Sequence, residues 1–348
     1  MPVVVRFTAP RRVDLHSYDD RELVATEVRV RTLFSGISAG TELTAYRGSN
    51  PYLAKRWDED GRLFVPDAVS LEYPVEGWGY EEVGEVVELG AEVRTVALGD
   101  IVWGTWGHRS SAVLPEDVAA NCTLPSGVDP IIGAFAHIGA IALNAVLDAD
   151  IHVGERVAVF GQGTPGLITG QLARLNGGSV IAVDAIDSRL ELAQRLGAAH
   201  TFSALASPSP AQRITHLTGG HGADVSIEIS GHYAALHEAI RATAWSSRVV
   251  AAGFFQGPGT VLALGEEFHH NRIDVVGSQI SGVRPALSHR WDVRRLQRTI
   301  MELAAQGRIN LPALVSHVMP VGDAADAFEL LDQHQEQAVQ VLLDFREQ

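Results

Sequence analysis

The glycine-rich segment Gly161-Gln162-Gly163-Thr164-Pro165-Gly166 has the spacing of a loop that cradles phosphate. Gly161 permits a tight turn, Gly163 lets the backbone approach a pyrophosphate, and Gly166 allows a helix to pack closely on a strand. A helical pattern begins at Pro165, where a missing N–H leaves no hydrogen bond unmade. The free N–H groups of that helix start favour an anion. The segment therefore predicts a dinucleotide site, with a plain glycine turn as the alternative.

Asp184 follows the next apolar run, residues 179–183, where a carboxylate can accept hydrogen bonds from both ribose hydroxyls of an adenosine. The same carboxylate repels a 2′-phosphate, so NAD is favoured over NADP. Arg189 keeps NADP open, because its guanidinium could either stack on adenine or meet a 2′-phosphate. Ser230-Gly231 and Gly253-Phe254 follow later apolar runs, and we expect both pairs to complete the cofactor site.

The segments around these residues alternate between short apolar runs and helical patterns, which is typical of βαβ units on a parallel sheet. The sequence predicts strands at 155–160, 179–183, 224–229, 248–252 and 273–276, and helices at 165–175, 187–196 and 232–242. Residues 203–212 are rich in Pro and Ser and are predicted to form a loop.

The regions on either side have a different character. Residues 24–31 and 82–89 alternate or are rich in Val, which predicts strands of an irregular β-rich domain. An amphipathic helix is expected around residues 296–303, another helix around 328–331 and a last strand at 339–345. We expect this C-terminal part to pack back on the N-terminal domain.

Several motifs of the N-terminal part are similar to those of the medium-chain dehydrogenase/reductase superfamily. Ser35–Glu42 resembles its Cys-Gly-Ile-Cys-Gly-Thr-Asp segment with one residue inserted, and Gly79–Gly84 resembles its Gly-His-Glu-x-x-Gly motif. Val87–Gly90, Leu98–Val102 and Ala142–Ala145 resemble segments that follow these motifs in the family.

The resemblance implies an α/β protein in two parts. Residues 1–149 and 284–348 would form a GroES-like, β-rich catalytic domain. Residues 150–283 would form a Rossmann domain with a doubly wound parallel sheet. The resemblance also implies a homodimer joined through edge strands, and residues 273–278 read as that strand.

The metal-binding positions of the family have changed in this chain. Zinc-dependent members use a Cys, a His and a further Cys or acid, where this sequence has Ser38, Tyr80 and His137. Serine and neutral tyrosine are poor Zn²⁺ ligands beside thiolate and imidazole. The sequence therefore predicts a dehydrogenase without zinc. A zinc site rebuilt from Glu81, His108 and His137 is the alternative.

Without zinc, hydrogen-bond donors must polarise the substrate oxygen. The resemblance places Tyr80 and His137 near that oxygen, where they can donate and accept a proton. Thr41 lies where the family keeps a hydroxyl that relays the substrate proton. Ser38 could add a hydrogen bond and Glu81 could orient the site. The structural alternatives are a core aromatic at Tyr80, a buried histidine at His137 and a helix cap at Thr41.

Aromatic and polar side chains of the N-terminal part could shape a pocket for a sugar or cyclitol ring. The candidate substrate residues are Trp57, Trp78, Trp106 and His108. Packing in the core is the alternative for the tryptophans, and a place in a loop is the alternative for His108.

Composition excludes several other classes of protein. The formal net charge is −15 and no Lys/Arg run occurs, which argues against nucleic-acid and anionic-membrane partners. Cys122 is the only cysteine, so the chain has neither an internal disulfide nor a four-thiolate zinc site. The longest apolar stretch, residues 131–146, is too short and too polar for a membrane span of roughly 20 residues. No signal peptide is recognised, and a cytoplasmic protein is expected.

Together these patterns predict an NAD(P)-dependent oxidoreductase that interconverts a secondary alcohol and a ketone on a polyol, sugar or cyclitol. Two alternatives stay open. One is a zinc-free reductase of activated C=C bonds, of the quinone reductase type. The other is a non-catalytic protein that senses NAD(H).

Overall fold

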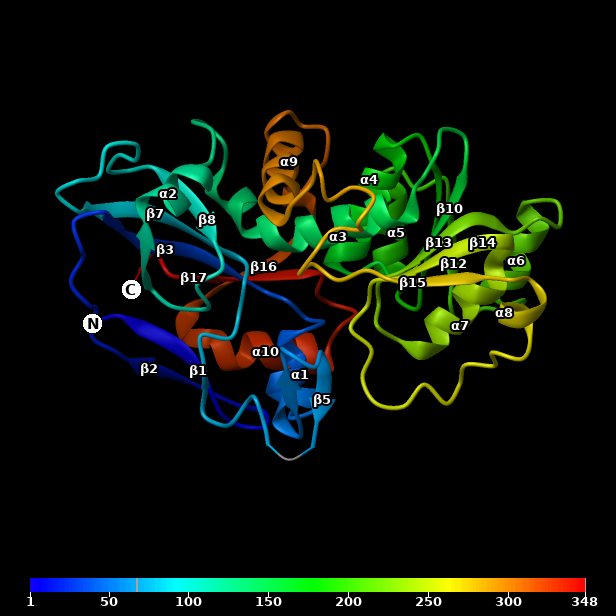
Figure 1. Cartoon of the computed structure of the whole chain (residues 1–348), viewed down its shortest axis with the longest axis horizontal. Coiled ribbons are helices and arrows are strands. Elements are labelled where there is room, and N and C mark those ends of the chain that lie inside the picture. The colour runs from blue at the N-terminus through cyan, green and yellow to red at the C-terminus, as the bar shows by residue number, and fades with distance from the viewer. Residues whose placement is uncertain (67, 348) are drawn as a thin grey trace. The chain divides into compact units, whose positions relative to one another are not determined.

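The computed structural model describes residues 1–66 and 68–347, and the chain divides into two compact units (Figure 1). The first unit consists of Met1–His137 and Val315–Gln348, and the second of Ile138–Leu314. The predicted domain limits, at residues 149–150 and 283–284, lie inside the second unit and stay a prediction.

The second unit is built on a six-stranded parallel sheet in the order β12-β11-β10-β13-β14-β15. The order reverses between β10 and β13, which makes this the switch point of a doubly wound fold and confirms the predicted Rossmann-type sheet. The strands are β10 Arg156–Phe160, β11 Ser179–Asp184, β12 His200–Ser203, β13 Ala223–Glu228, β14 Thr243–Ala251 and β15 Asp274–Gly277. The helices are α4 Thr164–Leu175, α5 Asp187–Arg195, α6 Pro210–Leu217, α7 Tyr233–Ala242, α8 Glu267–His270 and α9 Val293–Ala305.

Two elements of this unit differ from the prediction. The predicted loop at 203–212 ends early because α6 begins at Pro210. A capping box stabilises this start, in which the Gln212 side chain accepts a hydrogen bond from the Ser209 N–H at 3.0 Å. Strand β14 begins at Thr243, five residues before the predicted start. Its first part includes Trp245 and Ser246, polar or exposed positions that conceal the strand pattern.

The first unit contains a mixed sheet in the order β16-β17-β3-β7-β8, with β9 also paired to β3. Its strands are β3 Glu27–Ile37, β7 Glu82–Leu89, β8 Ile101–Gly104, β9 Ser111–Pro115, β16 Val315–Pro320 and β17 Gln340–Asp344. Smaller sheets are formed by β1 Val3–Ala9, β2 Arg12–Ser17 and β6 Val75–Glu76, and by β4 Arg56–Asp58 with β5 Leu63–Val65. The helices of the first unit are α1 Glu42–Arg47, α2 Glu116–Asn121 and α10 Ala324–Gln333, and its 3-10 turns include η1 Pro51–Leu53 and η4 Val321–Asp323. The 3-10 turn η3 Pro312–Leu314 belongs to the second unit.

The C-terminal strand joins the N-terminal part, as the sequence predicts. β17 pairs antiparallel with the end of β3, so that Val341 lies opposite Ile37. β3 also pairs with β7, and Ser35 lies opposite Glu82. Three segments that are remote in the sequence therefore meet at the end of β3, immediately before the turn that leads into α1. Helix α9, by contrast, belongs to the second unit.

One apolar segment passes a composition test for a membrane span. It is Pro130–Ala149, which comprises η2 Pro130–Phe135 and α3 Ala136–Ala149 and has a mean hydropathy of 1.8 in its most apolar window. The core helix of a globular protein passes the same test, and 72% of that window is buried inside the protein. Burial therefore accounts for its apolar sequence.

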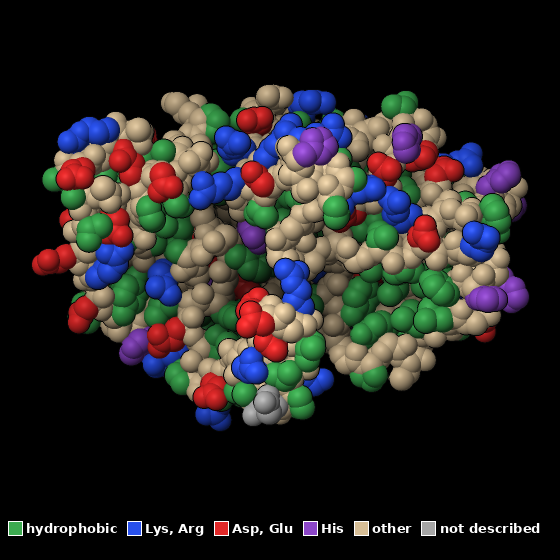
Figure 2. All heavy atoms as spheres, in the orientation of Figure 1, with side chains coloured by type: hydrophobic (Ala, Val, Ile, Leu, Met, Phe, Trp, Pro, Cys, Tyr) green, Lys and Arg blue, Asp and Glu red, His purple; other side chains and the backbone are tan. Residues whose placement is uncertain are grey.

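Charged side chains of both signs are interspersed on the face shown in Figure 2. Basic side chains gather over α9, whose sequence contributes Arg294, Arg295 and Arg298. Although the chain as a whole has a net charge of −15, this face therefore includes a basic area.

Candidate active site

The glycine-rich segment follows β10 and opens α4, at the switch point of the parallel sheet. Gly161 has a φ of +98°, and a Cβ there would lie 2.7 Å from Cβ of Ser230. A Cβ on Gly166 would lie 1.9 Å from the Gly161 carbonyl oxygen, so only glycine lets α4 start this close to β10. A Cβ on Gly163 would have no neighbour closer than 4.0 Å. The loop backbone at Gly163 is therefore not crowded, as a close approach by a phosphate requires.

Asp184, at the end of β11, braces this loop. Its carboxylate accepts hydrogen bonds from the Gln162 N–H at 2.5 Å and from the Ile186 N–H at 2.9 Å. The buried side chain of Gln162 donates to the Val159 carbonyl at 2.8 Å, so this residue helps to fix the loop through both its backbone and its side chain. The Arg189 guanidinium lies beside the loop, 4.0 Å from the Cβ position of Gly163. Asp184 and Arg189, the two residues that bear on the choice between NAD and NADP, therefore both lie next to the glycine loop.

Glu228, which the sequence analysis did not single out, lies at the centre of the second-unit site. It ends β13 and is fully buried, and its carboxylate accepts hydrogen bonds from the N–H groups of Ser230 at 2.8 Å and Gly231 at 3.1 Å. Burial raises the pKa of Glu228 to about 7, and these hydrogen bonds oppose the shift. A Cβ on Gly253 would lie 2.2 Å from the Gly231 nitrogen. The signal available in the sequence was an acid at the end of an apolar strand, directly before Ile229-Ser230-Gly231.

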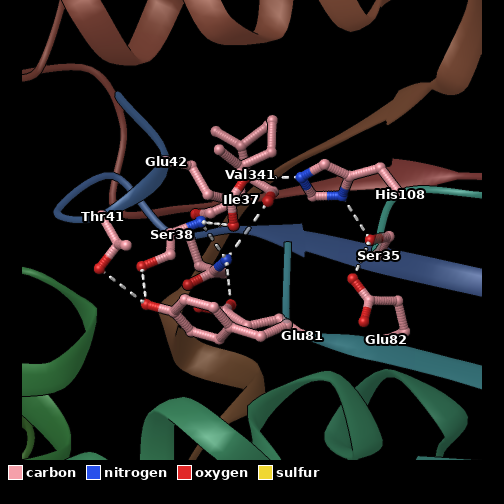
Figure 3. Close-up of polar contacts among 11 residues, drawn as sticks. Ser35, Ile37, Ser38, Thr41, Glu42, Glu81, Glu82, His108 and Val341 are labelled. Atoms are coloured by element: carbon pink, nitrogen blue, oxygen red, sulfur yellow. Dashed lines mark hydrogen bonds and ion pairs between the residues drawn. The ribbon is translucent and has the colours of Figure 1, made fainter. Parts of the chain in front are cut away.

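In the first unit, three hydroxyl side chains form a connected cluster (Figure 3). The Tyr80 hydroxyl makes a short hydrogen bond with Ser38 Oγ and donates to Thr41 Oγ1 at 3.3 Å. Thr41 is at the N-cap position of α1, but its side chain makes no capping hydrogen bond. Its hydroxyl is turned to Tyr80 instead. We call Ser38, Thr41 and Tyr80 the hydroxyl cluster.

His137 packs against Tyr80, with ring centroids 4.9 Å apart and planes inclined at 59°. Burial lowers the pKa of His137, which favours a neutral imidazole. Burial also raises the pKa of Tyr80, so the phenol is protonated at neutral pH. The pair thus combines a neutral base with a hydroxyl donor.

Glu81 lies next to the hydroxyl cluster and is almost fully buried. Its Oε2 accepts a hydrogen bond from Gln340 Nε2 at 3.0 Å, whereas its Oε1 has no hydrogen-bond partner among the described residues. Burial raises the pKa of Glu81 well above its ordinary value, and the neighbouring Glu42 and Glu82 reinforce the shift. A carboxyl in this setting is favoured in its protonated form.

The side chains at the three positions that the resemblance aligns with metal ligands, Ser38, Tyr80 and His137, are a poor donor set for zinc. They offer two hydroxyls and one imidazole, whereas Zn²⁺ prefers nitrogen and sulfur ligands. The hydroxyls of Ser38 and Tyr80 already bond to each other. Over residues 1–66 and 68–347, no three His, Cys, Asp or Glu side chains are grouped so as to hold a metal ion, and this includes Glu81, His108 and His137.

The predicted substrate residues lie in different surroundings. Trp57 contacts Phe64 in the β4–β5 hairpin, with ring centroids 5.1 Å apart, and Trp78 packs against the core formed by β1, α1 and α10. Trp106 donates its indole N–H to Thr32 Oγ1 at 2.9 Å. His108 is 1% exposed, and both of its ring nitrogens are engaged, with Glu42 and Ser35, so neither is left for a substrate.

Comparison with known proteins agrees with this architecture. A family model described as "Zinc-binding dehydrogenase" matches residues 166–294. The D-guloside 3-dehydrogenases of Shigella flexneri and Escherichia coli K12 are each 31% identical to this chain, over 97% of it and 98% of their own length. Sorbitol dehydrogenase 1 of Saccharomyces cerevisiae is 28% identical over 76% of this chain and 80% of its own.

Solved structures share the fold over nearly the whole chain. The 2R,3R-butanediol dehydrogenase of Bacillus subtilis superposes with a TM-score of 0.79 over 99% of both chains, at 20% identity. A dehydrogenase of Sinorhizobium meliloti 1021, solved with NADP bound, has a TM-score of 0.76 over 99% of both chains, at 22% identity. The chain belongs to the medium-chain dehydrogenase/reductase superfamily, as a member of its zinc-type alcohol dehydrogenase-like group, and by that membership it is an NAD(P)-dependent alcohol dehydrogenase.

Proposed function

We propose that this protein interconverts a secondary alcohol and a ketone on a sugar, polyol or cyclitol, with NAD as cofactor and without zinc. The observation that carries the proposal is the hydroxyl cluster beside His137. The resemblance aligns Ser38, Tyr80 and His137 with the metal ligands of zinc-dependent members and Thr41 with their proton-relaying hydroxyl, and these side chains are proton donors and acceptors in contact with one another. The activities of the D-guloside and sorbitol dehydrogenases support the substrate class.

The cofactor side of the proposal rests on the second unit. The open space at Gly163, the start of α4 and the carboxylate of Asp184 suit a pyrophosphate and an adenosine ribose. NAD, when bound, exchanges a hydride with the carbinol carbon. Asp184 favours NAD, and Arg189, beside Gly163, is the residue to examine if NADP is preferred.

The proton side rests on the first unit. Oxidation of the alcohol releases one proton from its hydroxyl, and reduction of the ketone takes one up. Because Tyr80 stays protonated, its hydroxyl is suited to donate to a ketone oxygen and to be reprotonated through Thr41 or Ser38. His137, neutral and in contact with the Tyr80 ring, is suited to accept the proton in the oxidative direction.

Replacement of the two groups tests this assignment. Tyr80→Phe and His137→Ala should each lower turnover on the order of 10²-fold, while NADH affinity stays near the wild-type value. Tyr18→Phe is a matched control, because the Tyr18 hydroxyl donates to the Ser111 carbonyl at 2.8 Å in the same unit and should leave turnover unchanged. Wild-type turnover in Tyr80→Phe would refute the proton assignment.

Chelation and a substrate panel test the rest. NADH oxidation should occur with ketoses and cyclic polyol ketones, and activity should survive chelator treatment. Stoichiometric zinc by elemental analysis, lost together with activity, would favour a rebuilt zinc site. Activity confined to enones would favour the C=C reductase, and cofactor binding without turnover on either panel would favour an NAD(H) sensor.

The assembly we propose is a homodimer through β15. This strand forms one edge of the six-stranded sheet, and Val275 on it is 39% exposed. An apolar edge strand is suited to pair with its symmetry mate. A monomeric mass by light scattering at micromolar concentration would refute this.

A further inference from the structure

A buried ion pair lies directly behind the hydroxyl cluster (Figure 3). His108 Nε2 is 2.6 Å from Glu42 Oε2, and both side chains are 1% exposed. Glu42 is the first residue of α1, and His108 lies between β8 and β9. Burying two charged groups destabilises the folded state unless hydrogen bonds satisfy their remaining polar atoms. The other hydrogen bonds of Glu42 and His108 show which segments this pair holds in place.

The second oxygen of Glu42 is bonded to the turn that carries the hydroxyl cluster. Glu42 Oε1 accepts a hydrogen bond from the Ser38 N–H at 2.9 Å, and the Glu42 N–H donates to the Ser38 carbonyl at 2.9 Å. These two bonds close the turn from residue 38 to residue 42. The turn contains Ser38 and Thr41, the two side chains that bond the Tyr80 hydroxyl.

His108 is held from its other side by a second chain of contacts. Its Nδ1 is 2.6 Å from Ser35 Oγ, and Ser35 Oγ donates to Glu82 Oε1 at 3.0 Å. With the Ser35 hydroxyl donating to Glu82, Nδ1 is placed to donate to Ser35 and Nε2 to donate to Glu42, which is the hydrogen-bonding pattern of a protonated imidazole. Burial lowers the pKa of His108, but the charges of Glu42 and Glu82 outweigh it and leave the pKa raised.

An aromatic ring also contacts the imidazole. The ring of Phe328, from α10, packs edge-on to His108 with centroids 5.9 Å apart. The charged groups facing His108 are Glu42 from α1 and Glu82 from β7. The ring cannot turn without breaking contacts on both sides.

We propose that Glu42 and His108 are positioning residues for proton transfer by Tyr80. Their ion pair fixes the turn of residues 38–42, and through it the two hydroxyls that orient the Tyr80 phenol. This inference rests on the proposed role of Tyr80. It extends that role to Glu42 and His108, which act on the phenol through Ser38 and Thr41 and not by direct contact.

The test compares two ion pairs at opposite ends of α1. Glu42→Gln and His108→Gln remove the charge of the proposed pair but keep hydrogen-bonding side chains of similar size. Arg47→Gln is the matched control, because Arg47 ends the same helix and pairs with Asp332, away from the hydroxyl cluster. Turnover and its pH profile, KM for NADH and thermal stability are measured for each variant.

The expected result is a loss that is confined to turnover. Glu42→Gln and His108→Gln should each lower kcat by about 10- to 100-fold, with KM for NADH within about twofold of wild type. The double variant should be no worse than either single variant, because both act through the same turn. Arg47→Gln should keep wild-type kcat.

Three outcomes would overturn the inference. The first is wild-type kcat in folded Glu42→Gln and His108→Gln. The second is an equal kcat loss in Arg47→Gln, which would indicate a general effect of α1 stability. The third is failure of both Gln variants to fold while Glu42→Asp, which keeps the charge but shortens the reach to Ser38, retains full kcat. If Tyr80→Phe itself has wild-type turnover, the proposed role of Tyr80 fails; if Tyr80→Phe loses turnover but folded Glu42→Gln and His108→Gln do not, only this inference fails.

Discussion

Both units bury carboxyl groups next to their candidate sites, but they satisfy them in different ways. In the second unit, Glu228 accepts hydrogen bonds from backbone N–H groups only two and three residues ahead of it. In the first unit, Glu42 bonds His108, which is 66 residues away, and Glu81 bonds Gln340, which is 259 residues away. Glu81 and Glu82 each also leave one oxygen without a hydrogen-bond partner among the described residues.

This difference indicates which contacts make each site rigid. A local loop that wraps a carboxylate forms as soon as its strand is in the sheet, because few residues need to be ordered. A remote network forms only when several strands have paired, and the energy of its buried carboxyls depends on contacts made by all of them. The second unit should therefore be sensitive to local backbone changes, and the first to changes of charge and hydrogen bonding.

The largest effect is expected at Gly166. Gly166→Val should weaken NADH binding by at least about 100-fold, because the new Cβ would lie 1.9 Å from the Gly161 carbonyl oxygen and would displace the glycine loop. Gly170→Ala on the same helix is the control, since its Cβ would make an ordinary contact at 3.7 Å with Val180. Titration of NADH fluorescence measures both. Near-normal affinity in Gly166→Val would show that the loop adapts.

The next effect concerns pH. The pKa of Glu228 and that of Glu82 are both raised by burial from 4.5 to about 7, so the folded protein keeps protons that the unfolded chain releases. Each carboxyl therefore lowers stability as pH rises from about 4.5 to 7, by up to about 3 kcal/mol. Glu228→Gln and Glu82→Gln should each flatten this fall.

The two variants should differ above pH 7. Glu82→Gln should be more stable than wild type there, because it removes a buried carboxylate whose Oε2 has no partner among the described residues. Glu228→Gln should gain less, because the carboxylate that it removes accepts several N–H bonds. Urea unfolding at pH 5 and pH 8 measures the difference. An equal gain in stability in both variants would contradict the idea that local N–H bonds satisfy Glu228 better than remote side chains satisfy Glu82.

A smaller effect is expected at Thr32. Thr32 Oγ1 accepts the Trp106 N–H at 2.9 Å and donates to the Arg109 carbonyl at 2.5 Å. Thr32→Val should lower stability by about 1–3 kcal/mol, since two buried polar groups lose their partner. Thr169→Val is the matched control: the Thr169 hydroxyl is buried without a hydrogen-bond partner among the described residues, so stability should not fall. Similar losses in both variants would mean that volume, not hydrogen bonding, matters.

The smallest effect is a change of cofactor preference. Asp184→Ser should shift the ratio of NADH to NADPH affinity toward NADPH by about tenfold, because the repelling carboxylate is removed. Asp187→Ser, an exposed position at the start of α5, should leave the ratio unchanged. Isothermal titration with both cofactors measures it. If wild type already prefers NADPH, the argument from Asp184 is wrong and Arg189 becomes the residue to replace.

The sequence alone determined the parallel sheet, the glycine loop and the family. These features depend on local patterns: the apolar runs of β10 and β11, the turn at Gly161 and the close packing at Gly166. It also identified Ser38, Tyr80 and His137, because they stand at motif positions. It placed His108 among the substrate residues and did not single out Glu42 or Glu228.

Only the tertiary structure decided what those polar groups bond. The pairing of β3 with β7 and β17 brings Ser35 opposite Glu82 and Ile37 opposite Val341, and the side chains of the first-unit network meet as a result. His108 bonds Glu42 rather than facing a pocket because both side chains are enclosed when the strands have paired. A hydrogen bond between residues that are 66 or 259 positions apart leaves no spacing to recognise in the sequence. The bonds of the hydroxyl cluster and of its ion pair are therefore properties of the folded protein.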